Sequence, residues 1–289
     1  MRLAGKPDQP RALEASYIAN LRRLVSQWGK PLHLDHDSPN EFIILHDTVE
    51  RLVKGDVLLP MITKHALDVN TFATKQMASV LGVSYGYKEG SSLLPTLASD
   101  LGGASVRDFR RFARGYVAAG DHFATPILTR AAQLVSAPRA PVDHLTKPLI
   151  DNFRDANVGL IQSLADNYLQ GVDDTLTDMA GARAEDVSAA LQHQLDITKS
   201  HADLIAVDQT LKLNADITKA RQLQVGIQEY VWMTAGDERV RPDHALLDGS
   251  RHEWHDMPPI VDRRTGRREP PGRDYRCRCQ AIAVIPGSD

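Results

Sequence analysis

The sequence predicts a mainly α-helical protein that carries a small C-terminal lobe of mixed α and β structure. Apolar residues recur every three or four positions through most of the chain, which is the spacing of amphipathic helices. Runs of β-branched and aromatic residues occur at 230–233 and 281–285, and each has the composition of a short strand. Residues 236–271, between these runs, are rich in charge, glycine and proline. We therefore expect a helical body followed by a compact lobe.

The first half of the chain contains several helical patterns. The first begins after Pro10, and five of its residues fall on one stripe of a helix: Leu13, Tyr17, Leu21, Leu24 and Trp28. Pro60 would lie in the first turn of another helix, where a missing N–H is tolerated. Further helices are expected at about 41–53, 56–81, 105–115 and 126–135, with loops at 32–40 and 82–90.

The second half opens with the strongest helical pattern. Eight residues keep the helical spacing there: Phe153, Asn157, Leu160, Leu164, Tyr168, Val172, Leu176 and Met179. Gly181 then provides a stop, because glycine readily adopts the left-handed conformation that ends helices. A shorter helix is expected at about 184–191 and a long one at about 197–223. The long helix is expected to bury Leu204, Val207, Leu211 and Ala215.

A domain boundary is expected at Ser136–Pro141, where the sequence SAPRAP combines two prolines with small residues. We expect an N-terminal helical domain over residues 1–140 and a C-terminal domain over residues 141–289. The second domain would consist of a helical pair followed by the β-containing lobe at 227–289.

Composition and charge exclude several classes of protein. The chain has 289 residues, of which 42% are hydrophobic and 25% charged, and this argues against global disorder. The formal net charge of −3 argues against a general nucleic-acid binder. The first ten residues lack the apolar core of a signal peptide, and no apolar run reaches the ~18 residues of a membrane span. Two cysteines do not make a disulfide framework, so we expect a reducing compartment such as a cytoplasm.

The segment after the first predicted strand carries alternating charges. Asp237, Arg239 and Arg241 suit reciprocal carboxylate–guanidinium bonding that would lock this turn. An ordinary solvated loop explains the same pattern equally well, because surface ion pairs are common and weak. Both interpretations stay open on the sequence alone.

A short helix is expected directly after this turn. Pro242 and Asp243 suit the first turn of a helix, and Gly249 suits its C-terminal stop. His244 would then stand on one or two turns of helix, shortly after the strand at 230–233.

Histidine and cysteine residues gather in the C-terminal lobe in a pattern that could ligate zinc. Cys277 and Cys279 form one C-x-C pair, and His244 is the expected third ligand, with His252 and His255 close in sequence. A bound zinc ion would supply folding energy to a lobe with a thin core. The alternative is that the cysteines are packed, reduced thiols and that the histidines lie on the surface.

An enzymatic interpretation of the same segment has less support. Asp243 and His244 resemble the start of a His-Asn-His nuclease motif, in which a histidine activates water beside a divalent cation. The asparagine and second histidine of that motif do not follow at suitable spacing. The sequence holds no G-x-S-x-G, P-loop or dinucleotide-binding pattern, and neither cysteine has a convincing activating partner. We do not expect an enzyme, and a metal-dependent nuclease remains the alternative.

Two basic clusters could touch phosphates or an acidic protein surface. The first falls at helical spacing and consists of Arg107, Arg110, Arg111 and Arg114. The second belongs to a loop and consists of Arg263, Arg264, Arg267 and Arg268. Ordinary solvated surfaces explain both clusters more simply.

The order of motifs from about Asp151 to Cys279 resembles the head-morphogenesis domain of tailed-phage minor head proteins, the family typified by the Mu F protein. The resemblance rests on ANVGLIQSLADNY and LIAVDQTLKLNADITKARQ in the long helices, followed by YVWMTAGDERVRPDHALLDG and PPGRDYRCRC. The chain differs from many members at Asp208, where they carry glutamate, and at 273–275, where they have a histidine shortly before C-R-C. The second difference leaves the fourth ligand of a zinc site unassigned.

This resemblance implies a non-enzymatic minor capsid protein of a tailed phage or prophage. It implies association with the portal protein and with the procapsid and its major capsid protein, and a part in head morphogenesis, DNA packaging or delivery. It further implies weak contact with DNA, no membrane and no small-molecule substrate. The expected location is the interior of the virion head, or the host cytoplasm during assembly. A zinc-stabilised interaction module unrelated to phage is the other alternative.

Overall fold

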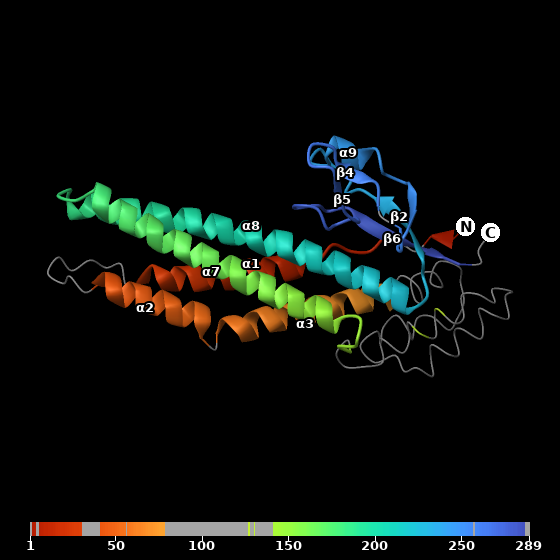
Figure 1. Ribbon diagram of the computed structural model, residues 1–289, viewed down its shortest axis with the longest axis horizontal. Helices are drawn as coiled ribbons and strands as arrows, with labels where there is room; N and C mark the ends of the chain where they lie inside the picture. The colour runs from red at the N-terminus through yellow and green to blue at the C-terminus, as the bar shows by residue number, and fades with distance from the viewer. Residues whose placement is uncertain are drawn as a thin grey trace. The chain divides into compact units, whose positions relative to one another are not determined.

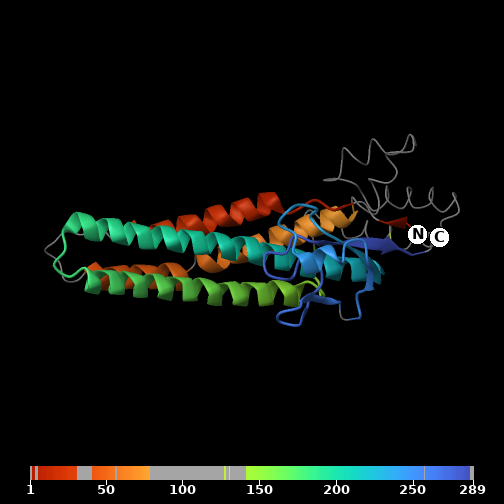
Figure 2. The ribbon, with the colours of Figure 1, turned by 90° about the horizontal axis from the view of Figure 1, so that it is seen from above.

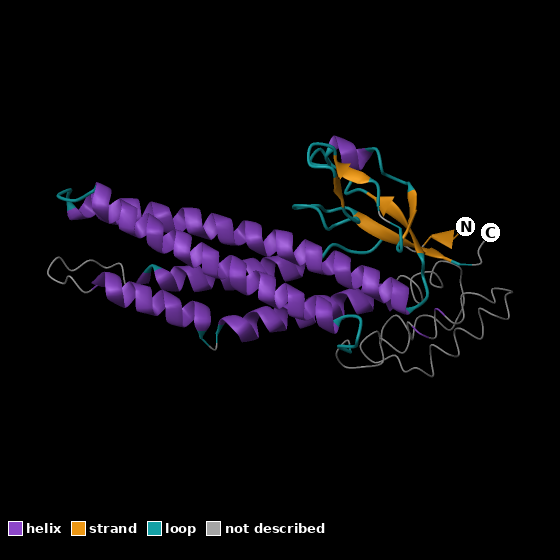
Figure 3. Ribbon diagram, viewed as in Figure 1, coloured by secondary structure: helices purple, strands orange, loops and turns teal. Residues whose placement is uncertain are grey.

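The computed structural model describes residues 2–3, 6–30, 41–55, 57–78, 127, 130, 141–256 and 258–286, with the backbone alone at 2–3, 41–44 and 260. Helices dominate within these ranges, and short antiparallel strands accompany them (Figures 1 and 3). The predicted fold class, mainly α with a small α+β lobe, is confirmed. Several expected features lie outside the described residues, namely the helix at 105–115, most of the helix at 126–135, both loops, nearly all of the boundary segment and the arginine cluster at 107–114.

The described elements largely match the expected ones. The helices are α1 (Arg11–Trp28), α2 (Glu41–Lys54), α3 (Leu58–Ala78), α7 (Lys147–Asp178), α8 (Ala184–Gln224) and α9 (Pro242–Ala245). The strands are β1 (Arg2–Leu3), β2 (Glu229–Met233), β3 (Arg251–Glu253), β4 (Ile260–Asp262), β5 (Arg267–Arg268) and β6 (Gln280–Ile285). No helix among the described residues is both long and apolar enough to cross a membrane.

Two compact units account for the described residues. The first, here called the β-containing unit, takes its residues from Met1–Pro10, Leu67–Leu149 and Leu211–Asp289. The second, here called the helical unit, takes its residues from Arg11–Ala66 and Ile150–Thr210. Packing thus groups segments that are far apart in the sequence. The sequence domains expected at 1–140 and 141–289 stay a prediction.

The helical unit is held by a buried polar chain that links its helices. The hydroxyl of Tyr17 on α1 donates a hydrogen bond to Oδ1 of Asn157 on α7, at 2.9 Å. The ring of Tyr17 stacks on the ring of His65 from α3, with centroids 4.1 Å apart. Nε2 of His65 lies 2.9 Å from Oγ1 of Thr210 on α8. Burial raises the pKa of Tyr17 above its ordinary range, so this hydroxyl keeps its proton.

The apolar stripes of α1 and α7 largely match the predicted ones. The predicted residues that are buried are Tyr17, Leu21, Leu24, Trp28, Phe153, Asn157, Leu164, Tyr168 and Val172. Leu160 is exposed instead, and the neighbouring Ile161 is buried. In Figures 1 and 2, α1 and α7 run alongside α8 within this unit.

The prediction of two helices between residues 184 and 223 is wrong, because α8 is one helix of 41 residues. At the expected break, the side-chain amide of Gln192 donates to Asp196 one turn later, at 3.1 Å. Such i,i+4 pairs stabilise a helix. Leu191 and Leu195 are buried across the same stretch, so packing also continues through it.

The buried face of α8 differs from the predicted stripe as well. Leu211 is buried as expected, whereas Leu204, Val207 and Ala215 are partly exposed. The face that packs inward is formed in large part by small residues and includes Ala202, Ala206, Thr210, Leu213, Ile217 and Ala220. Small side chains permit close packing of neighbouring elements, and an apolar pattern that favours large residues does not detect them.

The β-containing unit holds a four-stranded antiparallel sheet with strand order β1-β6-β2-β3. In this sheet Trp232 of β2 stands opposite Ala281 of β6, and Tyr230 stands opposite His252 of β3. Strands β4 and β5 form a separate two-stranded sheet. The sequence correctly predicted β2 and β6. It missed the other strands because they are two or three residues long and carry charged or polar side chains.

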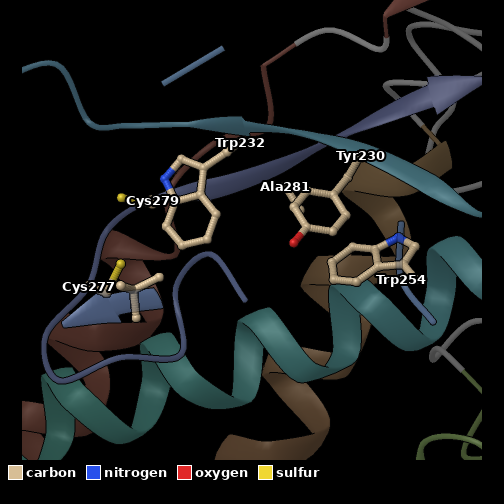
Figure 4. Packing of buried hydrophobic residues seen from close by; sticks show 7 residues of the cluster. Tyr230, Trp232, Trp254, Cys277, Cys279 and Ala281 are labelled. Carbon is tan, nitrogen blue, oxygen red and sulfur yellow. The ribbon is translucent and has the colours of Figure 1, made fainter. Parts of the chain in front are cut away.

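Aromatic rings form the core beneath this sheet (Figure 4). The rings of Tyr230 and Trp254 lie 4.2 Å apart between centroids, and Trp232 occupies the same cluster beside the two cysteines. Gln222 of α8 connects the cluster to the helix, because it accepts a hydrogen bond from Nε1 of Trp254 at 2.9 Å. Its side-chain amide also donates to the carbonyl of Ala281 at 3.0 Å. The end of α8 is therefore bonded to the sheet.

Candidate functional site

Two separate segments of the β-containing unit supply the candidate site. His244 stands on α9, which begins at Pro242 and follows the turn after β2. Cys277 and Cys279 come from the segment that leads into β6. All three side chains are buried, with exposed fractions of 2% for His244, 3% for Cys277 and 7% for Cys279.

The structure brings these three predicted ligands together. Nδ1 of His244 lies 3.4 Å from Sγ of Cys277 and 3.5 Å from Sγ of Cys279. The expectation that neither thiol has an activating partner is therefore not met at Cys277. A buried imidazole between two sulfurs can either hold a proton for a thiolate or share a metal ion with both thiolates.

The thiols perturb one another's protonation. A hydrogen bond from the thiol of Cys279 lowers the pKa of Cys277, and the hydrogen bond and charge of His244 lower it further, to about 5. Burial opposes this change. The pKa of Cys279 is raised, because it holds the shared proton and is buried. Burial disfavours a charged His244, but the hydrogen bond and charge of Cys277 outweigh that effect and leave the pKa of His244 raised. In the absence of a metal ion, the contacts thus favour the thiolate form of Cys277 beside the imidazole of His244.

Asp274, which was not predicted as a site residue, lies next to the Nε2 side of the His244 ring. Its Oδ2 lies 3.5 Å from Nε2 of His244, a buried nitrogen without a hydrogen-bond partner. The same carboxylate accepts hydrogen bonds from Arg241 and Arg267, each at 2.9 Å, and from the backbone N–H of Tyr275 at 2.8 Å. The signal for it in the sequence was its place three residues before Cys277 in PPGRDYRCRC.

The turn at 237–241 is fixed by hydrogen bonds, mainly to partners other than the expected ones. Both carboxylate oxygens of Asp237 accept hydrogen bonds from Arg278, at 2.6 Å each. Arg241 binds Asp274 and the carbonyl oxygen of Tyr275. The side chain of Arg239 is 69% exposed and its nearest ion-pair atom lies 3.7 Å from Asp237. Of the predicted pairs, Asp237 with Arg239 is present as this long ion pair, whereas the shorter bonds of Asp237 and Arg241 go to residues 274–278.

Gly249 does not end α9, which already ends at Ala245. It has a φ of +77° and its backbone N–H donates to the carbonyl of Trp232 at 2.8 Å. The glycine therefore closes the turn that returns the chain to β2. Its left-handed conformation is one that other residues adopt with strain.

The other candidate residues lie apart from the thiols. Nε2 of His252 lies 2.7 Å from Oγ of Ser250, and His255 pairs with Glu253 at 2.8 Å. The carboxylate of Asp243 pairs with Nε of Arg263 at 3.0 Å. Asp243 and His244 are neighbours in sequence, but their side chains contact different partners.

The second arginine cluster occupies the β4–β5 hairpin and is exposed. Arg267 reaches Asp274, and Arg263 reaches Asp243. Arg264 is 85% exposed and lies 3.9 Å from Asp262. Neighbouring carboxylates thus offset part of the positive charge of the hairpin.

Comparison with known proteins identifies a family for the C-terminal half. Residues 165–282 match the family described as Phage Mu protein F like protein. A Haemophilus influenzae protein, described only as an uncharacterized protein, is 36% identical over 135 residues, which are 46% of this chain and 29% of that protein. The chain thus matches less than a third of that relative's length. No solved structure matches the chain. The resemblance inferred from the sequence is confirmed at this level: residues 165–282, which include α9, both cysteines and Asp274, match the family described as Phage Mu protein F like protein.

Proposed function

We propose that this chain is a non-enzymatic minor head protein of a tailed phage or prophage that associates with the portal and the procapsid during head assembly. The family match over residues 165–282 carries the proposal. That range contains all of α8, the aromatic core of the β-containing unit and the buried histidine and thiols. The proposed function is therefore assigned to the part of the chain that matches the family.

The arrangement of polar groups supports a structural role. In the lobe at 229–286, carboxylates bind guanidinium groups across turns, as in Asp237 with Arg278 and Asp274 with Arg241. The reactive groups are enclosed, because His244 and Cys277 are almost without solvent contact. A nucleophile or general base must reach its substrate, and these side chains are instead occupied with one another. Such a lobe presents a fixed surface to a partner protein.

The nuclease alternative makes a different demand on the same residues. It needs Asp243 and His244 to face a cation and a water molecule together. Asp243 is paired with Arg263, and His244 faces the thiols and Asp274. Plasmid DNA incubated with the purified chain and Mg²⁺ or Mn²⁺ should therefore stay intact. Cleavage that is lost in a His244→Ala variant would contradict the non-enzymatic proposal.

Sedimentation tests the proposed association. Full-length tagged chain would be produced during phage induction, and head particles would be separated on a density gradient. We expect the chain in the procapsid fractions together with portal protein. Recovery of folded wild-type chain only at the top of the gradient, as free protein, would contradict the proposal.

Two variants make this experiment sharper. Arg241→Ala removes the bonds to Asp274 and Tyr275, whereas Arg264→Ala removes a side chain that is 85% exposed. If the braced lobe forms the docking surface, the first variant should reduce the amount in particles and the second should not. Equal incorporation of both variants would show that the lobe is not the docking surface.

A further inference from the structure

The site formed by His244, Cys277 and Cys279 has the donors and the geometry of a metal centre. Its three ligand atoms lie within 4.8 Å of one another, and all three residues are buried. Thiolate and imidazole donors in one site select zinc among the common divalent ions. We propose that these residues bind one zinc ion that has a structural role. This inference does not depend on the proposed function in head assembly.

The interatomic distances match tetrahedral zinc. A tetrahedral ion with typical bonds of about 2.3 Å to sulfur and 2.0–2.1 Å to nitrogen holds these atoms roughly 3.6 Å apart. The two sulfur-to-nitrogen distances are 3.4 and 3.5 Å. Both distances are therefore close to those of a tetrahedral zinc site.

A hydrogen bond between thiol and imidazole explains only one of these contacts. Nδ1 of His244 has one position for a hydrogen bond in the plane of the ring. Two sulfurs, those of Cys277 and Cys279, nevertheless lie at nearly equal distances from it. A single ion at the centre of the three atoms accounts for both contacts.

The environment of the second ring nitrogen supports the same assignment. Metal-bound histidines commonly donate their other N–H to a carboxylate, which fixes the tautomer and the ring orientation. Nε2 of His244 faces Oδ2 of Asp274 at 3.5 Å, and it has no hydrogen-bond partner. Arg241 and Arg267 hold that carboxylate in place. Asp274 lies on the Nε2 side of the ring, so it orients the histidine and does not serve as a ligand at Nδ1.

Charge balance favours the ion as well. Two thiolates, a neutral imidazole and Zn²⁺ sum to zero, which suits a site that is almost closed to solvent. The described residues supply three ligands, and a structural site takes its fourth donor from a further group of the protein.

The proposed ion would connect parts of the chain that local structure holds poorly. His244 and Cys277 are 33 residues apart, and the strands described in the segment between them are two or three residues long. Binding free energy at such a site becomes folding free energy, because the unfolded chain does not hold the ligands together.

Metal analysis of the purified full-length chain tests the proposal. The wild type should carry about one zinc per chain, and Cys277→Ser and Cys279→Ser should each reduce this to below about one tenth. His255→Ala is the matched control, because its exposed side chain pairs with Glu253 away from the thiols, and it should keep its zinc. Wild-type chain that binds no zinc, or serine variants that retain it, would overturn the assignment.

Cobalt substitution keeps the test decisive if the serine variants fail to fold. Wild-type chain stripped with a chelator would be titrated with Co²⁺, which gives strong visible and thiolate-to-metal absorption in tetrahedral sulfur sites. We expect these bands to saturate at about one cobalt per chain and to disappear when zinc is added. Absence of the bands in folded protein would overturn the proposal, and so would a disulfide between the two cysteines in protein prepared under reducing conditions.

Discussion

Arg241 donates a hydrogen bond from Nη1 to Oδ2 of Asp274 at 2.9 Å, across 33 positions of the sequence. The same guanidinium also binds the carbonyl of Tyr275. These two bonds fix the turn after β2 to the segment that carries the cysteines. They also hold the carboxylate that faces His244.

Removal of this brace should destabilise the β-containing unit. Arg241→Ala leaves the almost fully buried Asp274 with Arg267 as its remaining cation. We expect a loss of about 1–2 kcal/mol in the free energy of unfolding, measured by urea denaturation. Arg264→Ala should change it by less than about 0.5 kcal/mol, because that side chain is exposed. Equal losses of unfolding free energy in the two variants would show that the bonds of Arg241 to Asp274 and Tyr275 do not stabilise the unit.

Gly272 is required where the chain passes α8. Its φ is +86°, and a Cβ there would lie 3.1 Å from Cβ of Ala215 and 3.1 Å from the carbonyl oxygen of Cys279. Gly272→Ala should therefore cost about 2–3 kcal/mol, from backbone strain and from crowding together. Gly266→Ala is the matched control, since Gly266 has a φ of +69° and open space around its Cβ position. That variant should cost about 1 kcal/mol, and a comparable loss in both would show that crowding at Gly272 is unimportant.

Tyr17→Phe tests the polar chain of the helical unit. The substitution removes the hydroxyl that donates to Asn157 and keeps the ring that stacks on His65. We expect a loss of about 1–2 kcal/mol, because a buried acceptor is left without its donor. Tyr275→Phe, at a half-exposed ring, should be nearly neutral. Thermal or urea unfolding that is unchanged in Tyr17→Phe would contradict this role.

The pair of Asp143 and Arg221 should make stability depend on pH in acid. Burial alone would raise the pKa of Asp143, but hydrogen bonds from Gln224 and Thr146 and the charge of Arg221 hold it at about 2, below the ordinary 3.8. A lowered carboxylate pKa contributes stability that is complete above about pH 4 and is lost as the pH falls toward 2. We expect this contribution to be on the order of 1–2 kcal/mol after allowance for solvent screening.

The matched variant for this prediction is Asp143→Asn. It should be less stable than the wild type at neutral pH, since Arg221 loses its carboxylate partner. Between about pH 4 and pH 2 its unfolding free energy should fall less steeply than that of the wild type. Parallel slopes in the two proteins would show that Asp143 is not the titrating group.

Residue spacing was sufficient to predict the main helices and the two longest strands. The stripe from Tyr17 to Trp28 and the run from Tyr230 to Met233 carry strong local patterns, and both elements are present. The single helix α8 was predicted as two, because its continuity depends on the packing of small residues such as Ala202 and Ala206. The pairing of β1 with β6 was not predictable either, since Arg2 and Ile285 lie at opposite ends of the sequence.

In the candidate site, too, the sequence predicted some residues and missed the contacts that depend on the fold. Ligand chemistry was enough to select His244, Cys277 and Cys279 from the sequence, and the structure brings them together. The closest partners of Asp237 and Arg241, which are Arg278 and Asp274, were not predicted, because charges alternating in a turn do not show which distant groups the fold brings near. Asp274 was missed for that reason too. Its role depends on contacts from three segments that no local pattern connects.

Cross-linking followed by mass spectrometry on purified procapsids tests the central claim most directly. If the chain is a minor head protein, particles should contain it, and cross-links should join residues within 165–282 to the portal protein. Procapsids that assemble normally, contain portal and lack this chain would contradict the account.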